Sequence, residues 1–246
     1  MSNKLLVRVF NKVRWSSGGT KYAAETAFWV KEISLYKDWY EGKLKRHYGH
    51  EPPQARQKIK ANNLKDSAIL TWFSVHQKPK YLADLKLDKN AFKDMRLLDI
   101  GAGPMPSAAV FTDCEIYSLD PLYSEYIAAG YPLHYYDRVK FVNAYSEDIP
   151  IEDNYFDAAI SVNAIDHVDS LAKTAKEIER VLRPNGKFAM HVHYHEATEA
   201  EPLELNDKIF IKHFGWVKNL RKTESSQSKY GSVAEAGEEY AIWRNF

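Results

Sequence analysis

The stretch Arg96-Leu97-Leu98-Asp99-Ile100-Gly101-Ala102-Gly103-Pro104 decides the fold. An apolar run that ends in an acid and then enters a glycine turn is typical of a buried strand followed by a sharp turn. The two glycines let the backbone pass close to a ligand at the carboxyl end of that strand, where open α/β sheets bind nucleotide-like molecules. Met105 stands where a dinucleotide motif has its third glycine. This departure disfavours a dinucleotide as the ligand.

Strand and helix patterns alternate around this turn. We predict strands over 95–100, 115–119, 139–144, 156–162 and 187–194, a helix over 171–182 that ends at Pro184-Asn185-Gly186, and a helix over 206–214. Two closing strands are predicted over 216–222 and 239–246, joined by a polar loop over 223–237. Strands separated by helical lengths predict an α/β fold, with a mostly parallel sheet and helices on both faces.

The N-terminal third has helical patterning. A helix is predicted over 22–44, and one or two further helices over 55–81 that end near Pro79. Aromatic residues at helical spacing usually face a core, although some could stack on a flat acceptor; they are Tyr22, Trp29, Tyr36, Trp39 and Tyr40. We therefore divide the chain into a basic N-terminal segment (1–19), a helical cap (20–92) and a Rossmann-like domain (93–246).

Composition excludes several classes of protein. The 246 residues include 34 basic and 33 acidic residues, so the net charge of +1 gives no general attraction to nucleic acid. A single cysteine, Cys114, excludes an internal disulfide, and no apolar run is long enough to span a bilayer. These features predict a cytoplasmic protein.

The charge is uneven at the N-terminus. Residues 1–24 hold five basic residues and no acid, with apolar residues at helical spacing: the bases are Lys4, Arg8, Lys12, Arg14 and Lys21. The pattern predicts a basic amphipathic helix. Three interpretations stay open. The helix packs on the domain or on a second copy in a homodimer, residues 3–15 lie on the anionic surface of the inner membrane, or the segment is a frayed terminus.

Acids follow the next two strands at positions that suit a nucleoside. Asp120 ends the second strand, 21 residues after Asp99, where a carboxylate can bind both hydroxyls of a ribose. Glu147 and Asp148 lie on the loop after the third strand and can accept a hydrogen bond from the amine of a purine. Ile149 can cover one face of the ring.

These blocks, in this order, resemble the class I S-adenosylmethionine-dependent methyltransferases, in the branch that acts on small molecules. The similarity covers about residues 95–194 and includes the turn after Asp99, the Glu147–Pro150 loop, the Phe156–Asn163 strand, the Ile165–Val168 turn and the bend at Pro184. It implies a Rossmann-like class I methyltransferase fold with a seven-stranded sheet and an N-terminal helical cap. Asp166 replaces the usual Glu, and Asn185 replaces the first Gly of the bend.

The resemblance also implies how S-adenosylmethionine is held. The glycine turn holds the methionine portion through its backbone, Asp99 orients the amino group, Asp120 takes the ribose, and Asn163 lies near the carboxylate or sulfonium end. The full set of implied cofactor residues is Asp99, Gly101, Ala102, Gly103, Asp120, Pro121, Leu122, Glu147, Asp148, Ile149 and Asn163.

Histidines are the candidate catalytic residues. Methyl transfer to a hydroxyl requires removal of a proton, a task that suits imidazole near neutral pH. His167 follows the fourth strand, and His191, His193 and His195 alternate along the fifth, so the last three share one face. We name His167, His193 and His195 as candidates for the base. We assign no metal ligand, since imidazoles bind magnesium poorly; a magnesium-dependent enzyme would use Asp166 and Asp169.

The acceptor is predicted from what surrounds the cofactor half. The polar segment 195–203 and the aromatic residues of the cap favour a sugar, a nucleotide sugar or a polysaccharide-related acceptor, and thus sugar O-methylation in polysaccharide biosynthesis. One alternative is an RNA or protein methyltransferase that uses a basic stretch, Lys43-Leu44-Lys45-Arg46-His47 with Arg56, Lys58 and Lys60. Another is a binding module that has lost transfer activity. We expect a small-molecule or glycan substrate and no nucleic acid.

Overall fold

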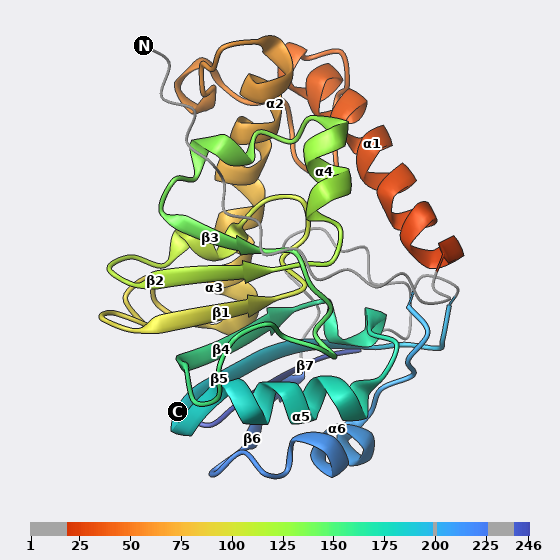
Figure 1. Cartoon of the computed structure of the whole chain (residues 1–246). Coiled ribbons are helices and arrows are strands. Elements are labelled where there is room, and N and C mark those ends of the chain that lie inside the picture. Colours follow the sequence, from red (N-terminus) through yellow and green to blue (C-terminus); the bar gives the residue numbers. More distant parts are fainter. Residues whose placement is uncertain (1–18, 199–200, 226–238) are drawn as a thin grey trace.

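The computed structural model describes residues 19–198, 201–225 and 239–246 of the chain (Figure 1). The basic segment 1–19, with residues 3–15, lies outside the described residues except for Gly19. Most of the predicted loop over 223–237 also lies outside them.

A seven-stranded sheet forms the centre of the molecule, with the strand order β3-β2-β1-β4-β5-β7-β6. The first five strands in this order are parallel, and β7 runs antiparallel to both β5 and β6. The strands are β1 (Arg96–Ile100), β2 (Glu115–Leu119), β3 (Val139–Val142), β4 (Phe156–Val162), β5 (Leu182–Tyr194), β6 (Arg221–Ser225) and β7 (Glu239–Arg244). The predicted mostly parallel, Rossmann-like sheet is confirmed, and its order reverses between β1 and β4.

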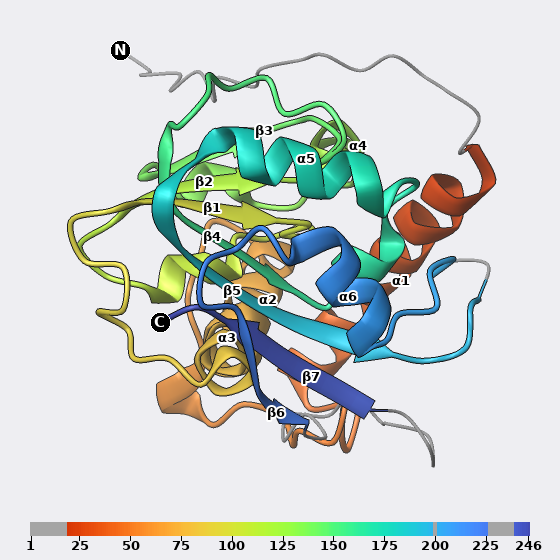
Figure 2. The same cartoon turned by 90° about the horizontal axis from the view of Figure 1, so that it is seen from below.

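Helices cover both faces of the sheet (Figures 1 and 2). On one side lie α1 (Gly19–Glu41), α2 (Leu64–Trp72), α3 (Lys78–Leu85) and α4 (Tyr123–Ala129), and on the other lie α5 (Leu171–Val181) and α6 (Asp207–Phe214). Each strand contributes side chains to two cores, one on each face of the sheet, because successive side chains point to opposite faces. Leu97 packs with the first group of helices, and Leu98 packs with α5 and α6.

The N-terminal helices share one core with the sheet. Tyr36 and Trp39 of α1 are each only 1% exposed and stack or pack against Trp72 of α2. The same core continues into Leu97 of β1 and Ala189 of β5. The cap is therefore held on the sheet by apolar burial, and this fixes α1 beside the carboxyl ends of the strands.

Several expected boundaries are wrong. Residues 55–63 contain only one 3-10 turn (Ala55–Gln57), and the helix that follows does not end near Pro79 but continues to Leu85. A π-helical turn, Phe73–Gln77, directly precedes α3. Its wider winding relieves the clash that a proline ring makes with the preceding carbonyls, so Pro79 is accommodated at the start of α3.

Two C-terminal strands also differ from expectation. β5 begins at Leu182, which pairs with Phe156, and an irregularity then shifts the register before Lys187. Asn185 takes a positive φ of 62°, so the Pro-Asn-Gly bend lies within the strand. Trp216–Leu220 forms turns after α6, and β6 starts only at Arg221.

Candidate active site

A cavity of about 230 Å³ lies at the carboxyl ends of β1, β2 and β4, beside the reversal of strand order. Its wall comes from the turns after these strands, from the loop after β3 and from the N-terminal helices. The predicted residues in the wall are Gly101, Ala102, Gly103, Asp120, Pro121, Glu147, Asn163 and His167. Open α/β sheets bind ligands at this position.

The glycine turn after β1 requires residues without a Cβ. Gly101 and Gly103 have positive φ values of 67° and 71°, a region that residues with a Cβ rarely adopt. A Cβ on Gly101 would lie 2.3 Å from the Cβ of Ala164, and one on Gly103 would lie 4.0 Å from the Trp29 ring. Gly101 thus allows close packing of two turns, and Gly103 keeps the backbone open toward α1.

Asp120 joins the ends of β1 and β2. Its Oδ2 accepts a hydrogen bond from the N–H of Gly103, and its Oδ1 accepts one from the N–H of Leu122, each over 2.9 Å. Burial, together with the charge of Glu25, raises the pKa of this carboxyl to about 7. Leu122 itself is 5% exposed and packs in the core, so its backbone orients Asp120 while its side chain lies outside the cavity wall.

Asp99 lies beneath the cavity and does not line it. The side chain is fully buried, and the hydroxyl of Tyr81 donates to its Oδ1 over 3.4 Å. Burial raises the pKa of Asp99 to about 8.

The loop after β3 is attached to the start of α5. Glu147 lines the cavity, and its Oε1 accepts hydrogen bonds from the N–H groups of Asp169 and Ser170 at 2.8 and 3.0 Å. Asp148 is exposed, and Ile149 is 2% exposed within the core against α5; neither lines the cavity. Of the two acids expected at an adenine amine, Glu147 is the one in the wall.

Asn163 ends β4 in a left-handed conformation with φ 51°. Nδ1 of His191 donates to its Oδ1 over 2.9 Å. Burial lowers the pKa of His191 to about 3, so the imidazole is neutral. Its ring also stacks on Tyr240, and His191 therefore orients Asn163 at the cavity wall.

His167 is the candidate base that lies in the cavity wall. Its Nε2 is 3.4 Å from Oε1 of Glu201, and its main-chain oxygen accepts a hydrogen bond from Lys21. Lys21 also forms an ion pair with Asp169 at 2.7 Å. Burial lowers the pKa of His167, but the bond to Glu201 and the charges of Asp166 and Glu25 outweigh it and raise the pKa to about 8.

The other two candidate bases lie outside this wall. The ring of His193 stacks on Tyr240, with centroids 4.4 Å apart, and its centroid lies 4.3 Å from that of His195. Nε2 of His195 is 3.1 Å from Oδ2 of Asp166, and this hydrogen bond raises the pKa of His195 to about 9. Of the two acids that a magnesium-dependent enzyme would use, Asp169 pairs with Lys21, whereas Asp166 faces His195.

The sequence analysis missed several polar residues of the wall. Tyr22 and Trp29 were expected as candidates for stacking, but Glu25 of the same helix also lines the cavity. Its spacing, three residues after Tyr22 and four before Trp29, places it on the same helical face and could have revealed it. Gln77 and Lys80 reach the cavity from the π turn and α3, where no sequence pattern indicates a site.

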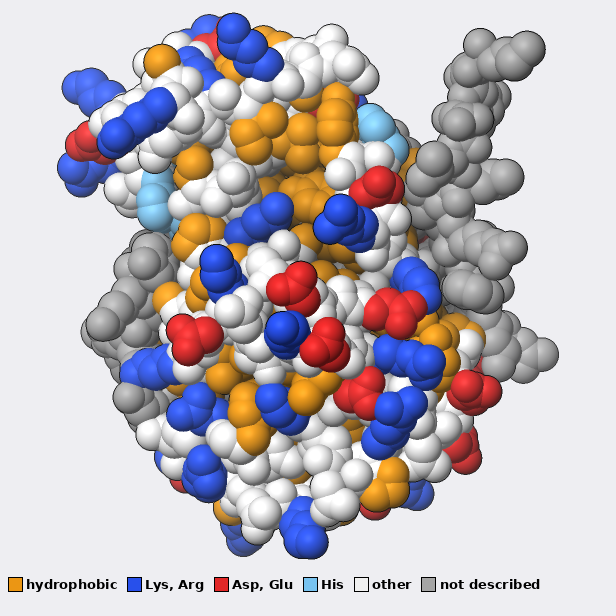
Figure 3. Space-filling model, turned by 90° about the vertical axis from the view of Figure 1, so that its left-hand side faces the viewer, with side chains coloured by type: hydrophobic (Ala, Val, Ile, Leu, Met, Phe, Trp, Pro, Cys, Tyr) orange, Lys and Arg blue, Asp and Glu red, His pale blue; other side chains and the backbone are white. Residues whose placement is uncertain are grey.

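Three residues in the basic stretch of the cap are paired with acids. Lys43 pairs with Glu41, Arg46 lies 3.4 Å from Glu51, and His47 is buried against Glu32. On the face that holds the amino ends of the parallel strands, acidic and basic side chains are interspersed (Figure 3). Within the described ranges, no helix has the length and apolar character needed to cross a membrane.

Comparison with known proteins supports a methyltransferase. The family model of a methyltransferase domain matches residues 98–190. The ubiquinone/menaquinone biosynthesis C-methyltransferase UbiE of Brucella canis is 31% identical over 129 residues, 45% of this chain and 46% of that protein. The chain thus spans about half the length of this curated relative.

Solved structures share the fold. Phosphoethanolamine N-methyltransferase 2 of Haemonchus contortus, in complex with S-adenosyl-L-methionine, superposes with a TM-score of 0.54 and 14% identity over 79% of this chain and 60% of that chain. A SAM-dependent methyltransferase of Thermotoga maritima gives 0.51 and 18% over 70% of this chain and 91% of that chain. Residues 98–190 thus match the model of a methyltransferase domain, and the chain shares the fold of these enzymes, which supports S-adenosylmethionine as its cofactor.

Proposed function

We propose that this protein transfers a methyl group from S-adenosylmethionine to an oxygen of a small polar acceptor such as a sugar or nucleotide sugar, with His167 as the general base. The observation that carries the proposal is the placement of the glycine turn, Asp120 and His167 in the wall of one cavity. The cofactor supplies an electrophilic methyl group on a sulfonium. The residues of this chain must align the acceptor with that methyl group, shield the site from water and remove a proton from the acceptor.

The cavity fits the cofactor through features of this chain. The turn at Gly101 and Gly103 provides backbone without side chains on the cavity side, and Asp120 offers a carboxylate held in place by two N–H donors. Glu147, also in the wall, is held by the N–H groups of Asp169 and Ser170 just before α5. These residues would hold the methionine portion, the ribose and the adenine amine, respectively.

His167 is placed to take a proton from an acceptor hydroxyl. The imidazole lies in the wall, and its Nε2 is 3.4 Å from Oε1 of Glu201. The carboxylate of Glu201 stabilises the charged imidazolium that forms on proton transfer. Lys21 holds the main chain of the same residue. The base is therefore oriented from two directions before an acceptor binds.

The remaining wall favours a polar acceptor. Glu25, Gln77 and Lys80 add a carboxylate, an amide and an ammonium to the aromatic rings of Tyr22 and Trp29. Rings provide flat apolar contact for a sugar face, and polar groups can exchange hydrogen bonds with its hydroxyls. This mixture supports a polyhydroxylated acceptor rather than a purely apolar one.

C-methylation is the second candidate, because the curated relative at 31% identity is a C-methyltransferase. A test uses cofactor with a ¹³C-labelled methyl group and panels of nucleotide sugars, sugar phosphates and quinols, with S-adenosylhomocysteine release as the first readout. The ¹³C resonance of the product then separates an O-methyl from a C-methyl group. An O-methylated sugar supports the proposal; a C-methylated product, or transfer only to quinols, contradicts it.

A further inference from the structure

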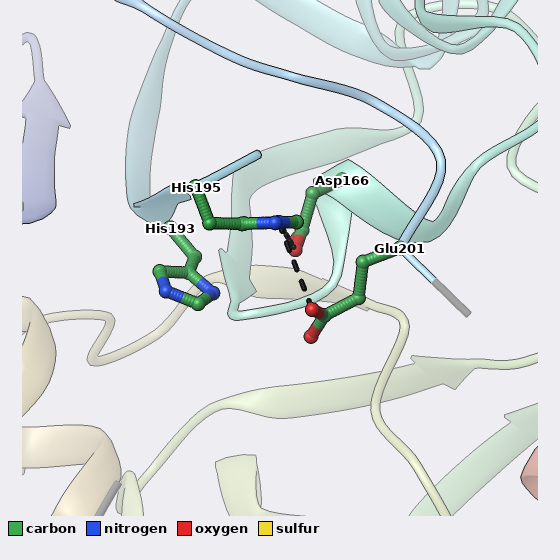
Figure 4. Close-up of side chains that lie close together, drawn as sticks. All are labelled: Asp166, His193, His195 and Glu201. Carbon is green, nitrogen blue, oxygen red and sulfur yellow. Dashed lines mark hydrogen bonds and ion pairs between the residues drawn. The ribbon is translucent and has the colours of Figure 1, made fainter. Parts of the chain in front are cut away.

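A cluster of four side chains, here called the His/acid cluster, lies next to His167 outside the cavity wall: Asp166, His193, His195 and Glu201 (Figure 4). One potential ligand atom from each residue lies within 4.8 Å of all the others. Asp166 comes from the 3-10 turn after β4, His193 from β5, and the other two from the segment that follows β5. Three separate parts of the chain thus converge on one point.

Asp166 brings a buried carboxyl group whose hydrogen bonds are incomplete among the described residues. Its side chain is 1% exposed, and Figure 4 shows it directed into the cluster. Oδ2 faces Nε2 of His195 at 3.1 Å, but Oδ1 is buried and has no hydrogen-bond partner among the residues that the structure describes. An unpaired carboxylate oxygen away from water is costly, and such a group in a native protein indicates a missing partner.

The orientation of His195 points to a cation. Its Nδ1 donates to the main-chain oxygen of Glu196 over 2.6 Å, since a carbonyl can only accept. With Nδ1 engaged in this way, Nε2 faces the acids Asp166 and Glu201 at 3.1 and 3.8 Å, where it carries either a proton or a metal ion. Lone pairs that face one another require a proton or a metal ion between them. Metal-bound histidines commonly donate their other N–H to a backbone carbonyl in this manner.

The structure assigns to the His/acid cluster one divalent transition-metal ion, of the zinc, iron(II), cobalt(II) or manganese(II) type. Two imidazole nitrogens with two carboxylate oxygens suit these ions, whereas magnesium and calcium prefer oxygen alone. The two carboxylate charges balance those of a divalent cation. The stacking of His193 on Tyr240 fixes the direction of one ligand in advance.

This inference goes beyond the proposed function and does not depend on it. His167 also faces the cluster, with Nε2 3.9 Å from Oδ2 of Asp166. An ion in the cluster would therefore lie one side chain away from the cavity. The competing explanation is that protons on the imidazoles alone hold the four side chains together.

The test measures ion binding to the full chain without methyl transfer. Chelator-treated protein is titrated with Zn²⁺ by calorimetry and with Co²⁺ by visible absorption, and Mn²⁺ is tested by paramagnetic relaxation. We expect one ion per chain. His195→Ala and Asp166→Asn should each weaken Zn²⁺ binding by more than the ~10–100-fold that loss of an outer-shell partner costs. His134→Ala, on an exposed histidine before β3, should leave the affinity unchanged.

X-ray absorption of the unmodified zinc-loaded protein requires no variant and so is independent of folding defects. We expect scattering from two imidazoles and from oxygen at about 2.0–2.2 Å. Three results would each overturn the metal site. The first is that none of the three ions binds, the second is a spectrum without scattering from imidazole, and the third is equal Zn²⁺ affinity in the unmodified protein and in His195→Ala. None of these results affects the proposed function, which S-adenosylhomocysteine release tests separately.

Discussion

The N–H of Gly103 donates to Oδ2 of Asp120 over 2.9 Å and so joins the turn after β1 to the end of β2. One hydrogen bond thereby fixes the two elements expected to hold the methionine portion and the ribose. Because the Leu122 N–H holds the other oxygen, the carboxylate cannot rotate freely. The cofactor pocket is thus arranged by contacts within the chain.

Asp120→Ala should weaken S-adenosylmethionine binding by at least about 100-fold, because hydrogen bonds to a charged group contribute roughly 1.5–3 kcal/mol each. Calorimetry with S-adenosylmethionine measures the change. Asp137→Ala, an exposed acid just before β3, is the matched control and should bind normally. Equal affinity in the Asp120 variant would remove this carboxylate from the ribose site.

Gly101→Ala should destabilise the fold by about 2–4 kcal/mol, from a strained positive φ and a crowded contact. The added Cβ would lie 2.3 Å from the Cβ of Ala164. The double variant with Ala164→Gly removes the crowding and leaves the strain, so it should recover part of the loss. Urea unfolding measures both. A double variant as unstable as the single one would show that the contact with Ala164 is unimportant.

His167→Ala should lower the rate of methyl transfer by about 10²–10⁴-fold, the usual contribution of a general base. Cofactor binding should remain close to normal, since the cofactor contacts proposed here belong to other residues. S-adenosylhomocysteine release and calorimetry measure the two effects separately. Unchanged turnover would transfer the role of base to His193 or His195.

Asp99 makes stability depend on pH. Its folded pKa of about 8 lies above the roughly 3.9 of an unfolded aspartate, so folding takes up a proton between these values. This contribution to stability is complete below about pH 4 and is lost as the pH rises to about 8. Asp99→Asn should therefore flatten the decline in unfolding free energy across this range.

Urea unfolding of the cofactor-free protein at several pH values measures this slope. Some decline should persist in Asp99→Asn, because the pKa of Asp120 is also raised, to about 7. A slope identical to that of the unmodified protein would mean that Asp99 is charged in the folded state.

The local elements near the glycine turn could be predicted closely. β2 and β4 have the expected bounds, and β1 begins one residue later than predicted, because short apolar runs between turn residues have few other ways to bury themselves. The helix past Pro79 was mispredicted because a π turn, which no local pattern indicates, relieves the proline clash. Expected site residues at the ends of β1, β2 and β4 came together in one wall. Ile149 is instead buried in the core against α5, and Asp148 is exposed, because packing against that helix decides which side chains of the loop turn inward.

The sequence by itself was sufficient to predict the α/β fold, the match to methyltransferases and the glycine turn. Each prediction rests on short local patterns that follow one another along the chain. Only the tertiary structure decided that Glu25, Gln77 and Lys80 complete the cavity, and that Asp166 and Glu201 meet His193 and His195. These contacts join segments far apart in the sequence. They depend on how the helices and the end of β5 pack, and packing results from the sum of many weak apolar contacts rather than from any local motif.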